Sequence, residues 1–171
     1  MERTELEREL ERLHTESWGW ALACCGRDEQ VAEDALQAAY LRILSGRARF
    51  DGRSSLKTWL FGVIRRTAME EARRWWSWRM RTADAEEGAQ VADPALGADA
   101  HAERSEQSAA LIAALAWISP RQREVLQLVF YHDLTIEEAA NIMGVSLGSA
   151  RTHYERGKQA LARRLRLEDT R

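Results

Sequence analysis

The sequence predicts an all-α fold in which two small helical domains are joined by a flexible acidic linker. Apolar residues recur at spacings of three and four along most of the chain, and no stretch alternates apolar and polar residues long enough to indicate a strand. Residues 82–104 lose this periodicity and are dominated by Asp, Glu, Ala and Gly, a composition typical of a tether. We therefore expect domains at residues 1–81 and 105–171.

The first domain is expected to contain three helices, at residues 3–25, 29–44 and about 55–79. In each of them the apolar residues fall on one face with the period of an α-helix. A short irregular segment, residues 47–54, separates the second and third helices and contains Phe50. The inner face of the third helix is expected to hold Leu56, Trp59, Leu60, Val63 and Ile64.

The second domain is expected to place two helices before a helix-turn-helix motif. The first covers residues 106–117, and the second covers residues 121–131. Ser119 is expected to cap this second helix, and Pro120 favours its first position, where the missing N–H is not needed.

The helix-turn-helix is predicted at residues 135–165. Thr135 can cap its first helix while Glu138 reaches back to the Thr135 amide, which makes a capping box. Gly144 supplies the turn, because glycine adopts left-handed backbone conformations without steric cost. Ser146 caps a second helix with a polar, mostly basic face, which suits the major groove of duplex DNA. The alternative is an ordinary helical hairpin.

Charges are arranged along the chain in blocks. The 171 residues carry a formal net charge of −2, which is unusual for a protein that binds DNA. However, residues 2–34 are acidic on balance, 47–81 are basic, 82–106 are acidic again and 151–166 are basic. Such alternation favours separate surfaces for separate partners.

The sequence indicates no enzyme activity, metal site, cofactor or membrane insertion. It has no stretch of 18 apolar residues and no export signal, so we expect a cytoplasmic protein. It also has no nucleophile–base pair and no phosphate-binding loop, so no catalytic residue is expected. No ligand-like spacing relates the histidines, which are His14, His101, His132 and His153.

Cys24 and Cys25 are neighbours in a helical stretch. Adjacent helical side chains point about 100° apart, which suits neither a shared metal nor an unstrained disulfide. We interpret both as small apolar residues, and a redox-sensing role is the alternative.

The residues considered so far resemble a known family, the extracytoplasmic-function (ECF) sigma factors of bacterial RNA polymerase. Residues 32–37, Ala-Glu-Asp-Ala-Leu-Gln, resemble the helix with which these proteins grip the polymerase core. Phe50, residues 56–61 and the closing residues 73–74 resemble the segment that opens and reads the minus-ten promoter element. Residues 118–126 precede the helix-turn-helix as they do in that family, where this motif reads the minus-thirty-five element. The two domains are thus similar to sigma regions 2 and 4.

The resemblance implies roles for three groups of residues. Those expected to contact core RNA polymerase are Glu33, Asp34, Gln37 and Leu41. The largest and second-largest polymerase subunits are the expected partners of the protein as a whole. Those expected to contact minus-ten DNA, including its non-template single strand, are Phe50, Arg53, Lys57, Trp59, Arg65, Arg66, Glu70, Arg73 and Arg74. Those expected to contact duplex minus-thirty-five DNA are Ser146, Ser149, Arg151, Thr152, His153, Arg156 and Lys158. An anti-sigma factor is a further expected partner.

Physical reasoning agrees with the polymerase-binding group. Glu33 and Gln37 are four residues apart and share a helical face, with Asp34 beside them. On a helix of otherwise small and apolar residues, they offer hydrogen-bond acceptors to basic side chains, such as those of the coiled coil that the resemblance names in the largest subunit. The alternative is a solvated acidic turn stabilised by the helix dipole.

The third helix interleaves cations with aromatic residues, as proteins that bind single-stranded DNA do. The resemblance makes the loop 50–55 the candidate pocket for a base flipped out of the duplex. Many family members have Asn in place of Arg66 and Asp in place of Glu70, so minus-ten reading is expected to differ here. Three interpretations of the tryptophans remain open, namely stacking on DNA, packing against the second domain and docking an inhibitor; these residues are Trp75, Trp76 and Trp78.

The acidic linker has two interpretations, a solvated tether or a segment that threads the polymerase near the path of nascent RNA. For the whole chain we expect promoter-specific initiation of transcription. Two alternatives are a stand-alone DNA-binding regulator that uses the same helix-turn-helix, and a sigma-mimicking protein that titrates an inhibitor without touching DNA.

Overall fold

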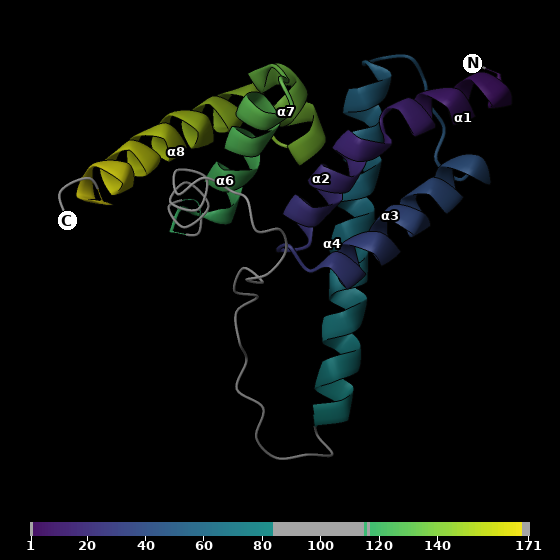
Figure 1. Cartoon of the computed structure of the whole chain (residues 1–171), viewed down its shortest axis with the longest axis horizontal. Helices are drawn as coiled ribbons and strands as arrows, with labels where there is room; N and C mark the ends of the chain where they lie inside the picture. Colours follow the sequence, from purple (N-terminus) through teal and green to yellow (C-terminus); the bar gives the residue numbers. More distant parts are fainter. Residues whose placement is uncertain (1, 84–114, 116, 169–171) are drawn as a thin grey trace. The chain divides into compact units, whose positions relative to one another are not determined.

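A computed structural model describes residues 2–83, 115 and 117–168, with side chains described up to residue 74 in the first range and up to residue 165 in the last. The chain divides into two compact units, unit 1 (residues 1–97) and unit 2 (residues 98–171), whose helices are labelled in Figure 1.

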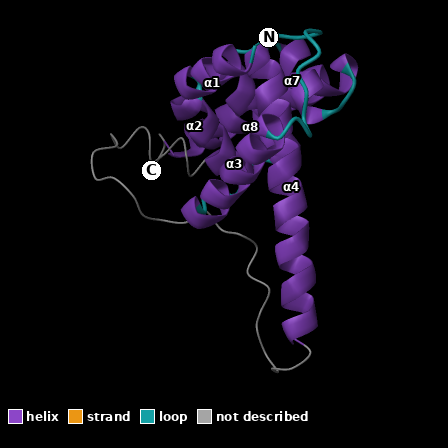
Figure 2. Ribbon diagram, turned by 90° about the vertical axis from the view of Figure 1, so that its right-hand side faces the viewer, coloured by secondary structure: helices purple, strands orange, loops and turns teal. Residues whose placement is uncertain are grey.

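All regular elements in the described ranges are helices (Figure 2). The predicted all-α fold with two helical domains is therefore confirmed. Most of the predicted linker (82–104) and nearly all of the predicted helix 106–117 lie outside the described residues.

Unit 1 contains the helices α1 (Arg3–Arg12), α2 (His14–Cys24), α3 (Glu29–Leu44) and α4 (Leu56–Ala83). Helices α2, α3 and α4 pack against one another in pairs and form the core. The C-terminal half of α4 continues past the other three helices (Figure 1).

The single helix predicted at residues 3–25 is divided at Leu13 into α1 and α2. Leu13 has φ −88° and ψ 1°, in the sparsely populated region between the helical and extended conformations. Backbone hydrogen bonds still run through the bend, from the amide of Leu13 to Glu9 and from that of Ser17 to Leu13. Because apolar residues keep their spacing across the bend, the sequence pattern does not reveal it.

Trp20 and Phe61 form the centre of the core of unit 1. Both side chains are buried, their rings stack with centroids 5.7 Å apart, and Trp20 Nε1 donates to the Phe61 carbonyl at 3.0 Å. A buried indole is stable only when its N–H finds such a partner. The predicted inner face of α4 is wrong in part, because Phe61 is buried while Leu56 and Trp59 are only half-buried.

The contact surface of α3 consists largely of small residues. Ala32, Ala35 and Ala39 have no exposed surface, so the backbone of α3 approaches its neighbours closely. The helix begins at an Asp28 cap, whose carboxylate accepts from the amide of Val31 at 3.0 Å.

Unit 2 contains α6 (Pro120–Leu126), the π-helical turn η1 (Gln127–Tyr131), α7 (Ile136–Met143) and α8 (Leu147–Glu168). The helix predicted at residues 121–131 therefore changes from α to π geometry, and the amide of His132 reaches back five residues to Gln127. Ser119 occupies the predicted N-cap position and Pro120 the first helical position, although no described residue donates a capping hydrogen bond to the Ser119 side chain.

The local chemistry predicted for the helix-turn-helix is confirmed. Thr135 Oγ1 accepts from the amide of Glu138 at 3.1 Å, and the Glu138 carboxylate accepts from the amide of Thr135 at 2.9 Å. Gly144 adopts the left-handed conformation, with φ 66° and ψ 39°. Ser146 Oγ accepts from the amide of Ser149 at 3.1 Å and caps α8.

Helix α8 crosses α6 closely at Gly157. A Cβ atom built there would lie 3.0 Å from Leu126 Cδ1 and 3.2 Å from Gln122 Cβ. This crossing, together with the completely buried Ala150, determines which face of α8 remains exposed.

Two glycine substitutions test whether the turn depends on the left-handed conformation. Gly144→Ala should lower the free energy of unfolding of unit 2 by about 1 kcal/mol, because an L residue is strained there. Gly148→Ala is the control, since Gly148 lies in α8 and an added Cβ would meet only Ser146 Oγ, at an ordinary contact distance of 3.9 Å, and it should raise this free energy by up to about 1 kcal/mol. Hydrogen exchange of amides in α7 and α8 measures both. Equal stability of the two variants would contradict the role given to Gly144.

Candidate functional site

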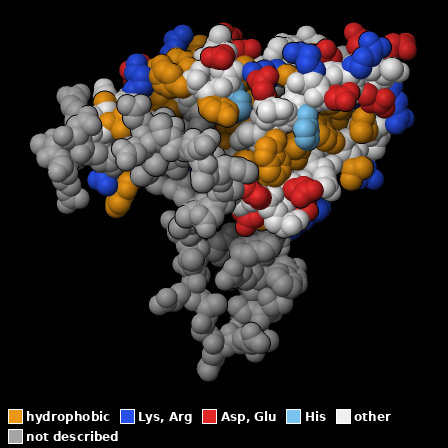
Figure 3. All heavy atoms as spheres, in the orientation of Figure 1, with side chains coloured by type: hydrophobic (Ala, Val, Ile, Leu, Met, Phe, Trp, Pro, Cys, Tyr) orange, Lys and Arg blue, Asp and Glu red, His pale blue; other side chains and the backbone are white. Residues whose placement is uncertain are grey.

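The first candidate surface is a stripe on the outer face of α3. We call it the α3 stripe; it consists of Glu33, Asp34, Gln37 and Leu41, all of them exposed. Gln37 Nε2 donates to Glu33 Oε1 at 3.1 Å, as expected of residues that share a helical face. Leu41 follows on that face and is 68% exposed, although burying such a side chain is favourable. Figure 3 shows hydrophobic and acidic side chains together over this part of unit 1.

The α3 stripe therefore combines acceptors at one end with an uncovered apolar side chain at the other. Interfaces between proteins commonly join a polar rim to a buried apolar centre in this way. The sequence placed these four residues on one helix, and the structure brings all four to its surface.

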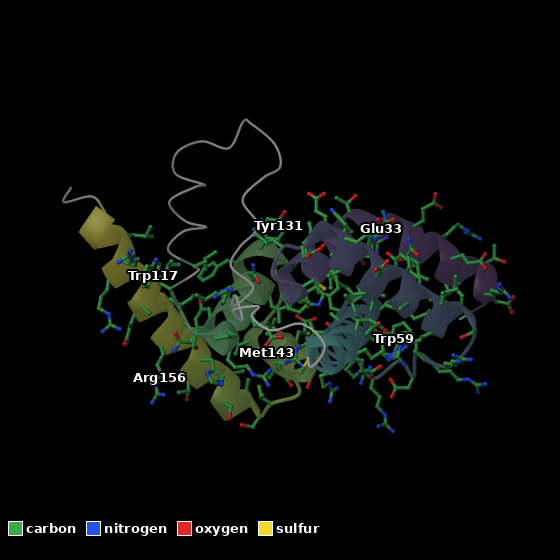
Figure 4. The ribbon with its side chains drawn as sticks, turned by 90° about the horizontal axis from the view of Figure 1, so that it is seen from below. Glu33, Trp59, Trp117, Tyr131, Met143 and Arg156 are labelled. Carbon is green, nitrogen blue, oxygen red and sulfur yellow. The ribbon has the colours of Figure 1, made fainter. Side chains whose placement is uncertain are left out.

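The second candidate surface is a cavity of about 240 Å³ between the loop after α3 and the outer side of α4. We call it the basic pocket. Its lining includes Arg42, Arg47, Arg49, Trp59, Arg66 and Glu70. The Phe50 ring packs against Trp59 with centroids 5.5 Å apart. Figure 4 shows Trp59 and Glu33 at opposite edges of unit 1 in that view.

One ion pair spans the basic pocket and joins α3 to α4. Arg42 Nη2 donates to Glu70 Oε2 at 2.5 Å, and Arg42 Nη1 donates to Thr67 Oγ1 at 3.5 Å. The hydrogen bond from Arg42 lowers the pKa of Glu70 below its usual value, with smaller contributions from the charges of Arg42, Arg73 and Arg74. Glu70 is therefore a carboxylate at neutral pH.

The structure brings together only part of the residues expected to contact minus-ten DNA. Trp59, Arg66 and Glu70 line the basic pocket and Phe50 supports Trp59. Three other exposed members of this group, Arg53, Arg73 and Arg74, do not line the pocket. Arg53 pairs with Asp51, and Arg74 pairs with Glu71.

Two of the expected DNA contacts are engaged within unit 1. Lys57 pairs with Glu16 and lies over the Phe61 ring. Arg65 is only 8% exposed, and this burial does not support its expected contact with DNA. Arg65 is four residues from the buried Phe61 and follows it on the inner face of α4.

The sequence pattern missed three arginines of the basic pocket. Arg47 and Arg49 counted only toward the positive charge of their block, and Arg42 was not singled out. The only indication for Arg42 in the sequence is its position directly after Leu41. Adjacent side chains on a helix point about 100° apart, so Arg42 is turned away from Leu41 and toward α4.

The third candidate surface is the exposed face of α8, which contains Arg151, Thr152 and Arg156. Arg156 points away from the helix in Figure 4. Thr152 Oγ1 donates to the Gly148 carbonyl at 3.0 Å, and Ser146 Oγ donates to Ser149 Oγ at 2.9 Å. A basic helix face that follows a helix-turn-helix is the usual occupant of a major groove.

Residues beside the exposed face of α8 are less accessible to DNA than those on it. His153 and Lys158 are half-buried. Lys158 pairs with Glu155 at 3.3 Å and lies 4.7 Å from the centre of the Tyr154 ring. These two residues are thus poorer candidates for base contacts than Arg151 and Arg156.

Unit 2 also exposes large aromatic side chains that the sequence pattern did not single out. Trp117 is 73% exposed, Phe130 is 63% exposed and Tyr131 is 75% exposed. The Phe130 ring stacks on Tyr154 with centroids 5.8 Å apart, and the Arg164 guanidinium lies 4.6 Å from the centre of the Trp117 ring. Exposed aromatic groups of this size mark surfaces that bind partners.

The described part of the chain contains no cluster of His, Cys, Asp or Glu that could hold a metal ion. None of its helices is long and apolar enough to cross a bilayer. The side chains of Trp75, Trp76 and Trp78 lie outside the described residues.

The alkylation rate of Cys25 tests the redox alternative. Burial, with the charge of Asp28, raises the pKa of the Cys25 thiol from 9.0 to about 11, and the thiolate is the reactive form. In a Cys24→Ser chain at pH 8, iodoacetamide should therefore modify Cys25 at least about tenfold more slowly in the folded protein than in denaturant. Equal rates would show that the thiol is not protected, and would revive the redox-sensing role.

Comparisons with known proteins match each unit to a family model and the chain to named relatives. The family model for sigma-70 region 2 matches residues 10–79, and that for sigma-70 region 4 matches residues 114–163. The ECF RNA polymerase sigma factor SigX of Bacillus subtilis is 33% identical over 146 residues, which cover 82% of this chain and 74% of SigX. The ECF RNA polymerase sigma factor SigC of Mycobacterium tuberculosis is 30% identical over 142 residues, which cover 83% and 74% of the two chains.

A solved structure shares the fold. It is that of the sigma factor RpoE in complex with the anti-sigma factor NepR from Bartonella quintana. This chain matches it with a TM-score of 0.71 at 23% sequence identity. The match covers 95% of this chain and 97% of the other.

Proposed function

The chain belongs to the ECF sigma factors, which direct promoter-specific initiation by bacterial RNA polymerase, and from this premise we propose which of its surfaces perform each step. The observation that carries the proposal is the basic pocket, where arginines and a tryptophan surround a cavity large enough for one nucleobase, in a chain that also has a helix-turn-helix. In this proposal the protein acts in the cytoplasm as a dissociable subunit of the polymerase, without catalytic chemistry of its own.

The α3 stripe binds core polymerase, with basic side chains of the coiled coil of the largest subunit as its partners. Support comes from the exposure of all four residues, and above all from Leu41, which the fold leaves uncovered. Complementary charge steers two such surfaces together and sets their orientation.

Unit 1 opens the minus-ten element and holds its non-template strand. In the basic pocket the Trp59 ring offers a stacking surface for an unpaired base, while exposed arginines follow the phosphates. Extruding a base costs a few kcal/mol, which the stacking and charge contacts offset. Of the cations expected to contact this DNA, Arg53, Arg66, Arg73 and Arg74 are exposed, and Arg47 and Arg49 of the pocket lining are exposed as well.

Unit 2 reads duplex minus-thirty-five DNA with α8. Arg151 and Arg156 reach bases or phosphates, and Ser146, Ser149 and Thr152 lie at the helix start, where recognition helices meet base edges. The domain limits that accompany this proposal are 1–81, 82–104 for the linker and 105–171.

An anti-sigma factor holds the free protein inactive in this proposal. Support comes from the exposed aromatic side chains of unit 2, Trp117, Phe130 and Tyr131. The same side chains contact the second-largest polymerase subunit once the anti-sigma factor has dissociated.

Run-off transcription with purified core polymerase tests the proposed function against its alternatives. The protein should add promoter-specific transcripts that core polymerase alone does not make. A stand-alone regulator would instead bind promoter DNA tightly without polymerase, and an inhibitor-titrating mimic would bind neither.

Charge reversal in the α3 stripe tests the polymerase interface. Asp34→Arg should abolish co-purification with core polymerase, because like charges facing each other cost several kcal/mol, and it should leave the helical content unchanged. Glu11→Arg is the matched control, since Glu11 is also exposed but lies on α1, and it should bind normally. Normal binding by the Asp34 variant would place the interface elsewhere.

Removing two cations from α8 tests the minus-thirty-five assignment. The double substitution Arg151→Ala and Arg156→Ala should weaken promoter binding by the polymerase complex. The slope of log affinity against log salt should fall by up to about 2, because each lost phosphate contact releases about one fewer counterion. Unchanged affinity and slope would exclude these residues from the DNA contact.

A further inference from the structure

This inference rests on the proposed function and concerns Lys57, an expected DNA contact that the fold engages elsewhere. Lys57 is the second residue of α4. Its Nζ pairs with Glu16 Oε2 on α2 and lies 5.7 Å from the centre of the buried Phe61 ring. Both contacts draw the ammonium toward α2, so Lys57 adds little to the basic surface proposed for DNA.

The ion pair of Lys57 with Glu16 lies at the rim of unit 1 rather than inside it. The side chain of Lys57 is 23% exposed and that of Glu16 is 42% exposed. Water therefore reaches both charges, and an ion pair in such a place contributes little to stability. Glu16 can thus be substituted without unfolding the chain, and its effect on DNA binding can be measured separately.

The start of α4 attracts anions for two reasons. The N-terminus is the positive end of the helix dipole, and the first turn of α4 carries Lys57 but no acidic residue. Phosphate groups bind readily at such a helix end. Glu16 supplies the missing negative charge from the neighbouring helix α2, so its carboxylate competes with a DNA phosphate for the same ammonium.

We propose that Glu16 is a positioning residue that withholds Lys57 from promoter DNA and thereby limits the affinity of unit 1 for the minus-ten phosphates. Glu16 acts through Lys57, because its carboxylate neutralises the ammonium and holds it on the α2 side. When the carboxylate is removed, the flexible lysine stem lets the ammonium turn toward the non-template strand. One phosphate contact is then gained.

Two other roles of Glu16 predict different outcomes. If Glu16 held Lys57 in the geometry that DNA needs, loss of the carboxylate would weaken binding. If Glu16 repelled DNA only at a distance, its loss would strengthen binding by the same factor whether or not Lys57 is present. A double-mutant cycle separates these roles, because it measures whether the effect of one side chain depends on the other.

The test uses the complete chain bound to core polymerase and a fluorescent fragment of the run-off template, left single-stranded across the minus-ten element. Fluorescence anisotropy gives the affinity at several salt concentrations for the wild type, Glu16→Gln, Lys57→Gln and the double variant. Glu11→Gln is the matched control, because Glu11 is an exposed glutamate of the same unit and its loss changes the net charge equally.

Glu16→Gln should raise the affinity about threefold, the scale of one exposed ion pair. It should also steepen the slope of log affinity against log salt by about 0.7, the value for one contact with single-stranded DNA. When Lys57→Gln is already present, Glu16→Gln should change the affinity by less than about 1.5-fold, since no ammonium remains to be released. Glu11→Gln should leave the affinity and the slope unchanged.

An unchanged or lower affinity in Glu16→Gln overturns the inference, and so does an equal gain with and without Lys57. A wild-type complex that binds the fragment no better than core polymerase alone contradicts the proposed function instead. Thermal melting checks that each variant is folded. If Glu16→Gln does not fold, Glu16→Asp is the second variant; its shorter carboxylate should release Lys57 in part and raise the affinity, and an unchanged affinity there also overturns the inference.

Discussion

The close packing of α3 in unit 1 is the constraint on which the proposed division of surfaces depends. Ala32, Ala35 and Ala39 are completely buried, and Leu36 and Ile43 nearly so, so α3 is held in the core by these small and apolar side chains. Its polar residues are left at the surface or at the edges of the contact. A helix anchored in this way can present a rigid outer face to a partner without losing its place in the core.

Two adjacent residues near the end of α3 serve different surfaces. Leu41 is exposed and extends the α3 stripe, whereas Arg42 turns to Glu70 on α4 and lines the basic pocket. Neighbouring side chains on a helix point about 100° apart, so one turn of helix supplies both. The proposed polymerase interface and the proposed base pocket are thus built on the same helix, which fixes the distance between them.

Periodicity and end signals were sufficient to predict the helices and the helix-turn-helix, because the capping box at Thr135 and the glycine at position 144 are local. The bend at Leu13 and the π turn before His132 were missed, since both preserve the apolar spacing. Phe61 was left out of the predicted inner face of α4, although it is buried there together with Arg65, which follows it on the same face. The pairing of Arg42 with Glu70 joins residues 28 apart in sequence, and no local pattern encodes such a contact.

Site-specific photo-cross-linking in an initiation complex tests the division of surfaces most directly. A cross-linking residue in place of Leu41 should attach to the largest polymerase subunit, and one in place of Arg49 should attach to the non-template strand of the minus-ten element. Attachment of the position 41 probe to DNA, or of the position 49 probe to polymerase alone, would contradict the account.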